Sequence, residues 1–192
     1  PFPAVTGRVC PHPCESGCNR EGVDQALNIH GMERTIGDYG IEKGLSFAKP
    51  DKSLDKKVAV IGSGPSGLSC AYQLARLGYK VTVFESEGRP GGMLSSIPGY
   101  RLPDSVVDAE INRILDLGIV IKTGVSLGRD ISLDDIKKEF AAVYIAPGAQ
   151  GSTSLGMSGE ENGLYSGLAF LKSVKKGHPL SIGKNVVVIG GG

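Results

Sequence analysis

The sequence of 192 residues predicts an α/β fold, and three observations support this prediction. Short β-rich runs alternate with segments whose apolar residues have helical spacing, which is the pattern of a parallel sheet covered by helices. A glycine-rich turn joins the first clear strand to the helix that follows it. Glycine makes up 29 of the 192 residues without a three-residue period, which excludes collagen and indicates tight turns or close approaches of the backbone to a ligand.

The first part of the chain is expected to form a small, partial helical domain over residues 1–48, followed by a linker over residues 49–56. Four prolines predict an irregular segment over residues 1–23. Apolar residues at loosely helical spacing predict a helix within residues 27–47, although four glycines weaken that pattern.

The next segment has the pattern of a strand, a turn, a helix and a second strand. Residues 57–61 form a β-rich run, and the helix over residues 68–77 stops at Gly78, which suits the position after a helix end. The second strand covers residues 80–84 and is followed by Glu85. Two parallel strands joined by a right-handed crossover are therefore expected.

The rest of the chain continues the alternation of helices and strands. The predicted elements are a helix over 103–117, a strand over 119–121, a short helix that begins at Ser132 with a capping-box pattern, a buried strand over 142–146, a helix over 168–174 and a final β-rich run over 186–189. Glycine-rich loops are expected over residues 86–102 and 147–163.

Composition excludes several classes of protein. Lysine and arginine number 21 against 20 acidic residues, so the net charge is +1, and without a long basic run no nucleic-acid partner is expected. No apolar run reaches the roughly 18 residues needed to span a membrane, and no signal peptide opens the chain. We therefore expect a cytoplasmic protein with no membrane partner. The hydrophobic fraction of 40% argues against disorder.

The turn over residues 62–67 has the spacing of a dinucleotide-binding fingerprint. Gly62 lies where the strand turns sharply into the helix, Gly64 lets backbone N–H groups approach a pyrophosphate, and Gly67 lets the helix pack closely on the strand. The positive end of the helix faces the phosphates. Glu85 lies where an acid accepts hydrogen bonds from ribose hydroxyls, which favours FAD or NAD over NADPH. A tight turn with a purely structural role is the alternative.

A second glycine pair, Gly91 and Gly92, follows Glu85 and favours FAD over NAD, because a plain NAD domain does not need it. The stretch over residues 84–94 resembles that of two-dinucleotide-binding flavoprotein oxidoreductases, in which this pair contacts the flavin side of FAD. A second fingerprint begins at the end of the chain, with glycine at positions 190, 191 and 192. We expect an FAD-binding domain over residues 57–184, the truncated start of an NAD(P)H-binding domain over 185–192, and hence a fragment of a longer polypeptide.

Three cysteines are crowded near the start of the chain, at Cys10, Cys14 and Cys18. Crowded cysteines in an intracellular protein indicate metal binding more often than a disulfide framework. A [4Fe–4S] cluster needs four ligands, so one loop could supply three to one cluster or divide them between two. From the spacing alone, a zinc site that recruits His12 or His30, and free structural cysteines, remain alternatives.

The segments Gly7–Asn19 and Asn28–Glu33, followed by the glycine fingerprint, resemble the small subunit of glutamate synthase. They also resemble the N-terminal half of dihydropyrimidine dehydrogenase, and the resemblance covers nearly the whole chain. It implies a helical domain with two [4Fe–4S] clusters, in which Cys10 and Cys14 serve one cluster and Cys18 the other. Glu33 aligns with a non-thiolate ligand. The family has further cysteines upstream that this chain lacks, so we expect an intact cluster only in the parent protein.

The same resemblance implies a set of FAD contacts. Residues of the first turn and helix would hold the pyrophosphate, Glu85 would bind ribose, and Gly92 and Met93 would lie near the flavin ring. The residues assigned to cofactor binding in this way are Gly62, Ser63, Gly64, Pro65, Ser66, Gly67, Glu85, Gly91, Gly92, Met93, Arg101, Leu127, Gly148, Gly190 and Gly192. A surface salt bridge is the alternative for Arg101, and a core position is the alternative for Leu127.

The resemblance implies an NAD(P)H-dependent flavoprotein oxidoreductase. It would take a hydride from NAD(P)H onto FAD and pass electrons through 4Fe–4S clusters to a large catalytic subunit or another electron-accepting subunit. No residue has the pattern of a general acid or base, so no catalytic residue is assigned. A non-redox nucleotide-binding module, a related NADH or ferredoxin oxidoreductase subunit, and a zinc module are the alternatives. The choice between NADH and NADPH stays open.

Overall fold

The computed structural model describes residues 1–152, 156 and 163–190. These residues form two compact units, Pro1–Gly148 and Ala149–Gly192, which are described separately below. In the described part of the chain, no helix combines the length and the apolar character needed to cross a membrane. The predicted domain boundaries, which follow residues 48 and 184, do not coincide with the division at Gly148. They remain predictions about which segment binds which cofactor.

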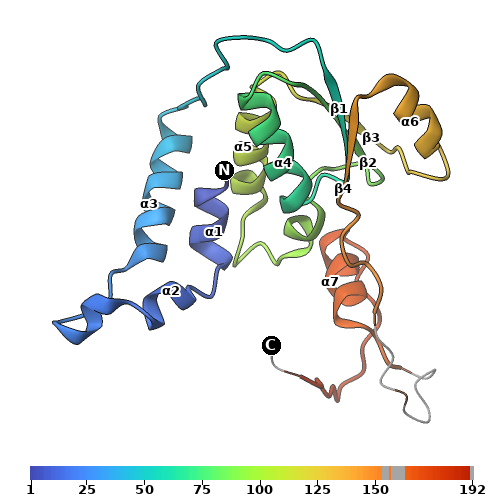
Figure 1. Ribbon diagram of the computed structural model, residues 1–192. Coiled ribbons are helices and arrows are strands. Elements are labelled where there is room, and N and C mark those ends of the chain that lie inside the picture. The colour runs from blue at the N-terminus through green and yellow to red at the C-terminus, as the bar shows by residue number, and fades with distance from the viewer. Residues whose placement is uncertain (153–155, 157–162, 191–192) are drawn as a thin grey trace. The chain divides into compact units, whose positions relative to one another are not determined.

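The first unit is built on a parallel sheet, which confirms the predicted α/β class (Figure 1). Its strands are arranged in the order β3-β2-β1-β4, so the crossovers run in both directions from β1. In register, Val58 of β1 lies between Val81 of β2 and Ala142 of β4. The strands are β1 (Lys57–Ile61), β2 (Lys80–Glu85), β3 (Val120–Thr123) and β4 (Ala142–Ile145).

Helices cover both faces of this sheet, because alternate residues of each strand point to opposite sides. Val60 and Val83 face a core formed with α4 (Pro65–Arg76) and α5 (Asp104–Leu115). Ala59 and Phe84 face the other way, toward α6 (Leu133–Glu139). The predicted cap of α6 is confirmed, since the Ser132 hydroxyl accepts a hydrogen bond from the backbone N–H of Asp135 at 3.1 Å.

The prediction of an irregular segment over residues 1–23 was wrong. The segment contains α1 (Pro3–Val9), α2 (Pro13–Ser16) and a 3-10 helix, η1 (Asn19–Gly22). Pro3 and Pro13 lie in the first turn of their helices, where the missing N–H has no partner to lose and the fixed φ angle suits a helix. Two of the prolines therefore begin helices here. The predicted helix within residues 27–47 is confirmed as α3 (Ile29–Glu42).

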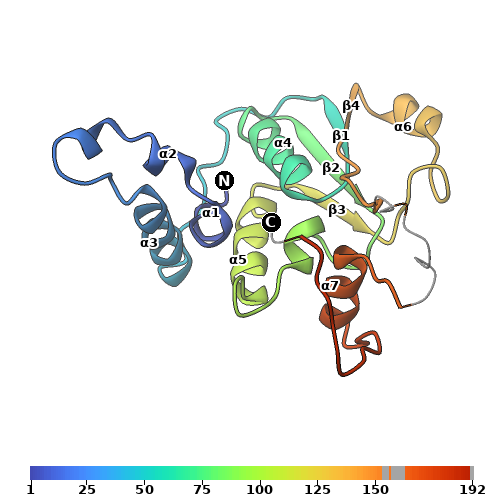
Figure 2. The ribbon, with the colours of Figure 1, turned by 90° about the horizontal axis from the view of Figure 1, so that it is seen from below.

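The first helix packs against the third through glycine. A Cβ atom at Gly37 of α3 would overlap the backbone nitrogen of Ala4 in α1, and one at Gly7 would lie 2.5 Å from the Cα atom of Arg34. The two backbones therefore touch directly. Phe2 and Val5 are buried in the same core as α4 and α5, so α1 is part of the first unit (Figures 1 and 2).

The predicted strand over residues 142–146 forms as β4, but the prediction that it is buried was wrong. β4 lies at the edge of the sheet with β1 as its only strand neighbour among the described residues, and Tyr144 and Ile145 are largely exposed. An apolar run can occupy an edge strand as readily as a central one, because its position depends on the strand order.

The second unit contains the predicted helix as α7 (Gly167–Lys175), capped by Ser166, whose hydroxyl accepts from the backbone N–H of Ala169. The β-rich run over residues 186–189 does not form a strand, so this prediction was wrong for the structure. A strand exists only when its backbone pairs with another, and within the described residues none pairs with this run. Gly190 nevertheless has a φ angle of +97°, the same as Gly62 in the first fingerprint.

Candidate functional site

The carboxyl ends of β1, β2 and β4 bring the first fingerprint together with two other predicted segments. The backbone N–H of Gly62 donates to the carbonyl of Phe84 at 2.7 Å, and that of Ala146 donates to the carbonyl of Ile61 at 2.8 Å. Ligands of open α/β sheets bind at this edge, outside the carboxyl ends of the strands. The sheet therefore places the turn over residues 62–67, Glu85 and the segment leading to Gly148 in one region.

Two glycines of the fingerprint are required by the fold itself. Gly62 has a φ angle of +97°, and a Cβ atom there would overlap the carbonyl oxygen of Ala146. A Cβ atom at Gly67 would overlap the carbonyl oxygen of Gly62. Because both neighbours are backbone atoms, they cannot move aside as a side chain could. These glycines make the tight passage from β1 into α4.

Gly64 differs from them because nothing crowds it. A Cβ atom there would have the Cα atom of Gly92, 4.0 Å away, as its nearest neighbour. The open space agrees with the predicted role of Gly64, which is to let a ligand approach the backbone.

The second glycine pair lies against this turn. The backbone N–H of Gly91 donates to the carbonyl of Ser63 at 3.0 Å, and a Cβ atom at Gly92 would lie 2.8 Å from the Cα atom of Gly64. Gly91 and Gly92 both have positive φ angles, which other residues rarely adopt. Residues 62–67 and 91–92 therefore form one cradle of backbone atoms.

The first turn of α4 opens into this cradle. Its N-cap is Gly64, which offers no side chain to cap the helix, and Pro65 follows in the first turn. The first turn contains no acidic residue. Its N–H groups and the positive end of the helix are thus free of a carboxylate and suited to an anionic group such as a phosphate. Ser66 is exposed beside this turn, and its hydroxyl lies 3.0 Å from that of Tyr144.

Glu85 is buried at the end of β2, with only 6% of its surface exposed. One carboxylate oxygen accepts from the backbone N–H and the hydroxyl of Ser63, at 2.8 Å and 2.5 Å. The other accepts from the hydroxyl of Ser86 at 3.2 Å and the backbone N–H of Glu87 at 2.8 Å. Burial acts to raise the pKa of Glu85, but these hydrogen bonds outweigh it, and its pKa is lowered below the ordinary value. The carboxylate of Glu85 is therefore held in a fixed position beside the cradle.

The remaining predicted residues of this site differ in their surroundings. Met93 is 41% exposed on a 3-10 helix, η2 (Gly92–Ser96). Arg101 is exposed, and its guanidinium donates to the carbonyl of Val9 at 3.5 Å. No ion pair involves Arg101 in the described residues, so the expected alternative of a salt bridge is not what holds it.

Leu127 packs in the apolar cluster of α6 with Ile136 and Phe140, which agrees with the alternative of a core position. Gly148 follows β4 with a φ angle of +73°. Gly190 belongs to the second unit, and Gly192 lies outside the described residues.

The cysteine segment surrounds α2. Cys10 ends α1, Cys14 is exposed within α2, and Cys18 precedes η1. Backbone N–H groups, that of Leu27 first and those of Arg20 and Glu21 after it, lower the pKa of the Cys18 thiol. A thiolate that accepts backbone hydrogen bonds is a suitable cluster ligand.

The structure does not gather the four predicted metal ligands into one group. Within the described residues, no three His, Cys, Asp or Glu side chains are placed to hold a metal ion. Glu33, the predicted non-thiolate ligand, accepts a hydrogen bond from the Thr6 hydroxyl at 2.6 Å. The rings of His12 and His30 lie 4.8 Å apart, and Glu15 accepts from the backbone N–H of His30.

Sequence reasoning missed the pair formed on α5 by buried Glu110 and partly buried Arg113. The available signal was a carboxylate in an apolar stripe, because Glu110 shares the buried face of α5 with Val107, Ile111 and Ile114.

Two sequence families match the chain. Residues 1–45 match the family described as dihydropyrimidine dehydrogenase domain II, 4Fe-4S cluster. Residues 60–119 match the family described as NAD(P)-binding Rossmann-like domain. The two matches coincide with the cysteine segment and with the cradle.

Curated proteins similar to the whole chain include two oxidoreductase subunits. The NADPH-Fe(3+) oxidoreductase subunit beta of Geobacter sulfurreducens is 43% identical over 200 residues, and the glutamate synthase [NADPH] small chain of Bacillus subtilis is 40% identical over 204 residues. Both alignments cover 100% of this chain, which spans 30% and 41% of the length of those proteins.

Among solved structures, FprA of Mycobacterium tuberculosis in complex with NADPH matches 62% of this chain and 28% of its own length, with a TM-score of 0.57 and 20% identity. This likeness supports the fold.

Proposed function

We propose that this chain, which is similar over its whole length to a glutamate synthase small chain and to an NADPH-dependent oxidoreductase subunit, is part of an NAD(P)H-dependent flavoprotein oxidoreductase. The protein would take a hydride from NAD(P)H onto FAD and deliver the electrons through 4Fe–4S clusters to a partner subunit. The observation that carries this proposal is the backbone cradle formed by residues 62–67 and 91–92, with Glu85 buried beside it.

The cradle fits a dinucleotide for physical reasons. No side chain caps α4 and its first turn has no acidic residue, so this helix end suits a pyrophosphate, and Gly64 leaves room for it to approach. Glu85 accepts from two serine hydroxyls, Ser63 and Ser86, and hydroxyl groups of a ribose are donors of the same type. We therefore assign the pyrophosphate to residues 63–68 and the ribose to Glu85.

FAD supplies the conversion of a two-electron hydride transfer into single-electron steps. The chain's own residues bind and orient it. The pair Gly91–Gly92, held against the fingerprint, would lie along the flavin side, with Met93 and Arg101 beside it. Gly148 follows the strand that contacts Gly62 and would close the same edge. We also propose Leu127 as an FAD contact, at a position where it packs beside α6.

The cysteine segment supports the iron–sulfur part of the proposal. Two clusters need two sets of four ligands, so Cys10, Cys14, Cys18 and Glu33 supply only part of them. We propose that Cys10 and Cys14 serve one cluster and Cys18 the other, with Glu33 as a non-thiolate ligand. The backbone hydrogen bonds to Cys18 suit a thiolate in that position.

The second fingerprint supports a nicotinamide nucleotide site. Gly190 repeats the φ angle of Gly62, which is the geometry of the first glycine in such a turn. We assign residues 185–192 to the start of that site, residues 57–184 to FAD binding and residues 1–48 to the clusters. The names of the relatives, a subunit beta and a small chain, support a partner subunit, and we propose that it accepts the electrons in the cytoplasm.

A titration with FAD tests this function. The purified chain should quench flavin fluorescence on binding, and Glu85→Gln should weaken binding about tenfold or more, because it removes a charged acceptor of ribose hydroxyls. Glu139→Gln, an exposed site paired with Lys57, is the matched control and should bind as the unmodified chain does.

In the longest protein expressed from the gene, NADPH or NADH added without oxygen should bleach the flavin absorbance. Electron paramagnetic resonance should then detect reduced clusters. Nucleotide binding without bleaching would instead support the non-redox module. Zinc without iron in the anaerobically purified protein would contradict the cluster assignment.

A further inference from the structure

The buried carboxylate of Glu110 is the most unusual polar group in the first unit. It lies on α5 with 1% of its surface exposed, among apolar residues of the main core. A buried carboxylate is costly unless hydrogen-bond donors surround it. The groups that donate hydrogen bonds to Glu110 indicate its role.

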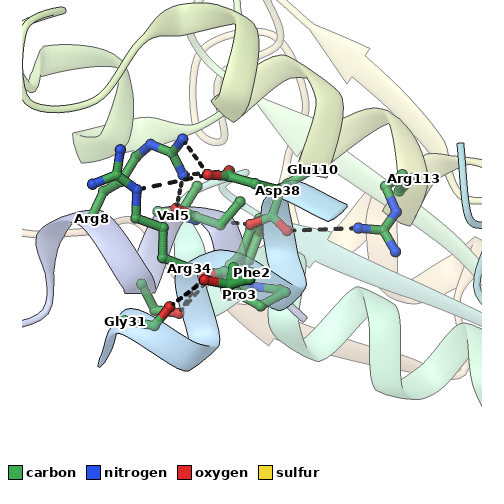
Figure 3. A network of polar contacts seen from close by, with 12 residues as sticks. Phe2, Pro3, Val5, Arg8, Gly31, Arg34, Asp38, Glu110 and Arg113 are labelled. Carbon is green, nitrogen blue, oxygen red and sulfur yellow. Dashed lines mark hydrogen bonds and ion pairs between the residues drawn. The ribbon is translucent and has the colours of Figure 1, made fainter. Parts of the chain in front are cut away.

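Those donors come from helix α1, which is more than a hundred residues away in the sequence. One oxygen of Glu110 accepts from the backbone N–H of Val5 at 3.1 Å (Figure 3). Burial raises the pKa of Glu110 above its ordinary value, and the backbone N–H groups of Val5 and Ala4 act in the opposite direction. The helix has no cap of its own, because its N-cap residue, Phe2, provides no side-chain hydrogen bond. Glu110 therefore caps α1 from the dinucleotide-binding fold.

The other end of α1 also contacts that fold. The guanidinium of Arg101 lies 3.5 Å from the carbonyl oxygen of Val9, the last residue of the helix. A carboxylate at the amino end and a guanidinium at the carboxyl end both match the polarity of a helix. We call Glu110 and Arg101 the α1 clamp. α1 lies beside α5 in both ribbon views (Figures 1 and 2).

The position of α1 decides where the predicted cluster ligands lie. Cys10 follows directly, and its backbone N–H donates to the carbonyl of Thr6 at 2.9 Å. The Thr6 hydroxyl donates to Glu33 on α3 at 2.6 Å. Arg8 forms an ion pair with Asp38 of α3 at 2.7 Å (Figure 3). A displacement of α1 would therefore move both Cys10 and Glu33.

Arg113 supports the same arrangement from the next turn of α5. Its Nε donates to the carbonyl of Leu45 at 2.8 Å, and its guanidinium stacks over the ring of Phe47 at 4.8 Å. It lies 3.8 Å from Glu110 (Figure 3). The segment that leaves α3 is thus also held to α5.

We propose that Glu110 and Arg101 are positioning residues that hold α1, and with it Cys10 and Glu33, in a fixed place on the dinucleotide-binding fold for electron transfer. This inference rests on the proposed function. In that function, NAD(P)H would be oxidised to NAD(P)+ when its hydride, two electrons with one proton, passes to FAD. The two electrons would then leave the flavin one at a time to oxidised clusters, and the proton would go to solvent. Glu110 acts on the outward step alone, because neither α1 nor Glu110 forms part of the cradle.

Hydrogen exchange of the α1 amides tests the clamp without any cofactor. In the chain itself, Glu110→Met removes the acceptor but keeps an apolar side chain of similar length. We expect about tenfold faster exchange over residues 4–10, because the backbone N–H of Val5 loses its partner. Glu110→Gln keeps an oxygen acceptor and should restore slow exchange. Arg101→Met should also speed exchange at the end of α1, whereas the exposed control Arg129→Met should not.

The cofactor-loaded longer protein tests the consequence. Glu110→Met should leave the rate of flavin bleaching by NADPH unchanged and slow the appearance of reduced clusters, with Glu110→Gln close to the unmodified protein. Unchanged exchange of α1 in both Glu110→Met and Arg101→Met overturns the clamp. The positioning role is overturned if Glu110→Met speeds exchange of α1 but leaves the rate of cluster reduction unchanged. It is also overturned if the rate of flavin bleaching falls as much as the rate of cluster reduction. Absence of FAD or clusters in the unmodified protein refutes the proposed function and the electron-transfer role together, and the exchange data still decide whether the clamp exists.

Discussion

Alanine substitutions at two glycines of the same turn should separate folding from cofactor binding. Gly67 and Gly64 are three residues apart, yet their surroundings differ. A Cβ atom at Gly67 would overlap the carbonyl oxygen of Gly62 and lie 3.2 Å from a methyl group of Val60. A Cβ atom at Gly64 would have 4.0 Å of clearance.

The cost of Gly67→Ala follows from these contacts. Overpacking against a rigid backbone costs about 3 kcal/mol, at the upper end of the usual range. Alanine is the better helix former by about 1 kcal/mol, which offsets part of this cost. The net loss of unfolding free energy is about 2 kcal/mol, or about 4–8 °C in the melting temperature of a chain of this size.

Gly64→Ala should behave in the opposite way. Alanine is a poorer N-cap, which costs about 0.5–1 kcal/mol, but it reduces the entropy of the unfolded chain by a similar amount. The φ angle of −69° causes no strain. Stability should therefore change by less than about 0.5 kcal/mol. The new methyl group occupies the space of approach to the backbone, so FAD affinity should fall about tenfold to a hundredfold through lost charged hydrogen bonds.

The assays are thermal unfolding followed by circular dichroism and FAD titration followed by flavin fluorescence. Gly22→Ala is the control, because nothing lies within 4 Å of a Cβ atom there. Equal destabilisation by Gly64→Ala and Gly67→Ala would refute the distinction between a packing glycine and a binding glycine. Unchanged FAD affinity in Gly64→Ala would refute the placement of the pyrophosphate at this turn.

Three further predictions concern stability. Because hydrogen bonds lower the pKa of Glu85, its contribution to stability is complete above its ordinary pKa of 4.5 and is lost as the pH falls through the lowered value. Glu85→Gln should remove this part of the pH dependence, which urea unfolding at pH 7 and below pH 4 would measure. Arg89 pairs with Asp104 at 2.9 Å and with Asp108 at 2.7 Å, and all three side chains are partly exposed. Arg89→Gln should therefore lower the unfolding free energy by about 1 kcal/mol in low salt and by less in 1 M salt, and a loss no larger than that of the exposed control Arg129→Gln in low salt would contradict this prediction. Gly37→Ala should push α1 off α3 and lower the unfolding free energy by about 2 kcal/mol in urea titrations, whereas a loss as small as that of Gly22→Ala would contradict direct backbone contact.

Much of the dinucleotide cradle was predictable because its requirements are local. The sharp passage from β1 to α4 depends on the φ angle of Gly62 and on the lack of a side chain at Gly67, and both follow from spacing in one short segment. Glu85 could be placed because the end of β2 must lie beside the end of β1 in a parallel pair. Helix starts were less predictable where proline was involved, since Pro3 can begin a helix or interrupt one.

The predicted cofactor residues outside the cradle depend on contacts that spacing does not describe. Arg101 contacts the end of α1, and Leu127 packs beside α6, although both follow the fingerprint in the sequence. The burial of β4 was misjudged for the same reason, because an apolar run does not reveal whether a strand has neighbours on one side or both.

The sequence by itself determined the α/β class, the position of the dinucleotide turn and the presence of a cysteine segment, because each depends on residue types at short, fixed separations. The tertiary structure alone decided that Gly64 faces Gly92, that Gly37 touches Ala4 and that Glu110 caps α1. These contacts join residues that are tens of positions apart in the chain. Their formation depends on how whole helices dock on the sheet, and periodicity specifies an apolar face without specifying its partner.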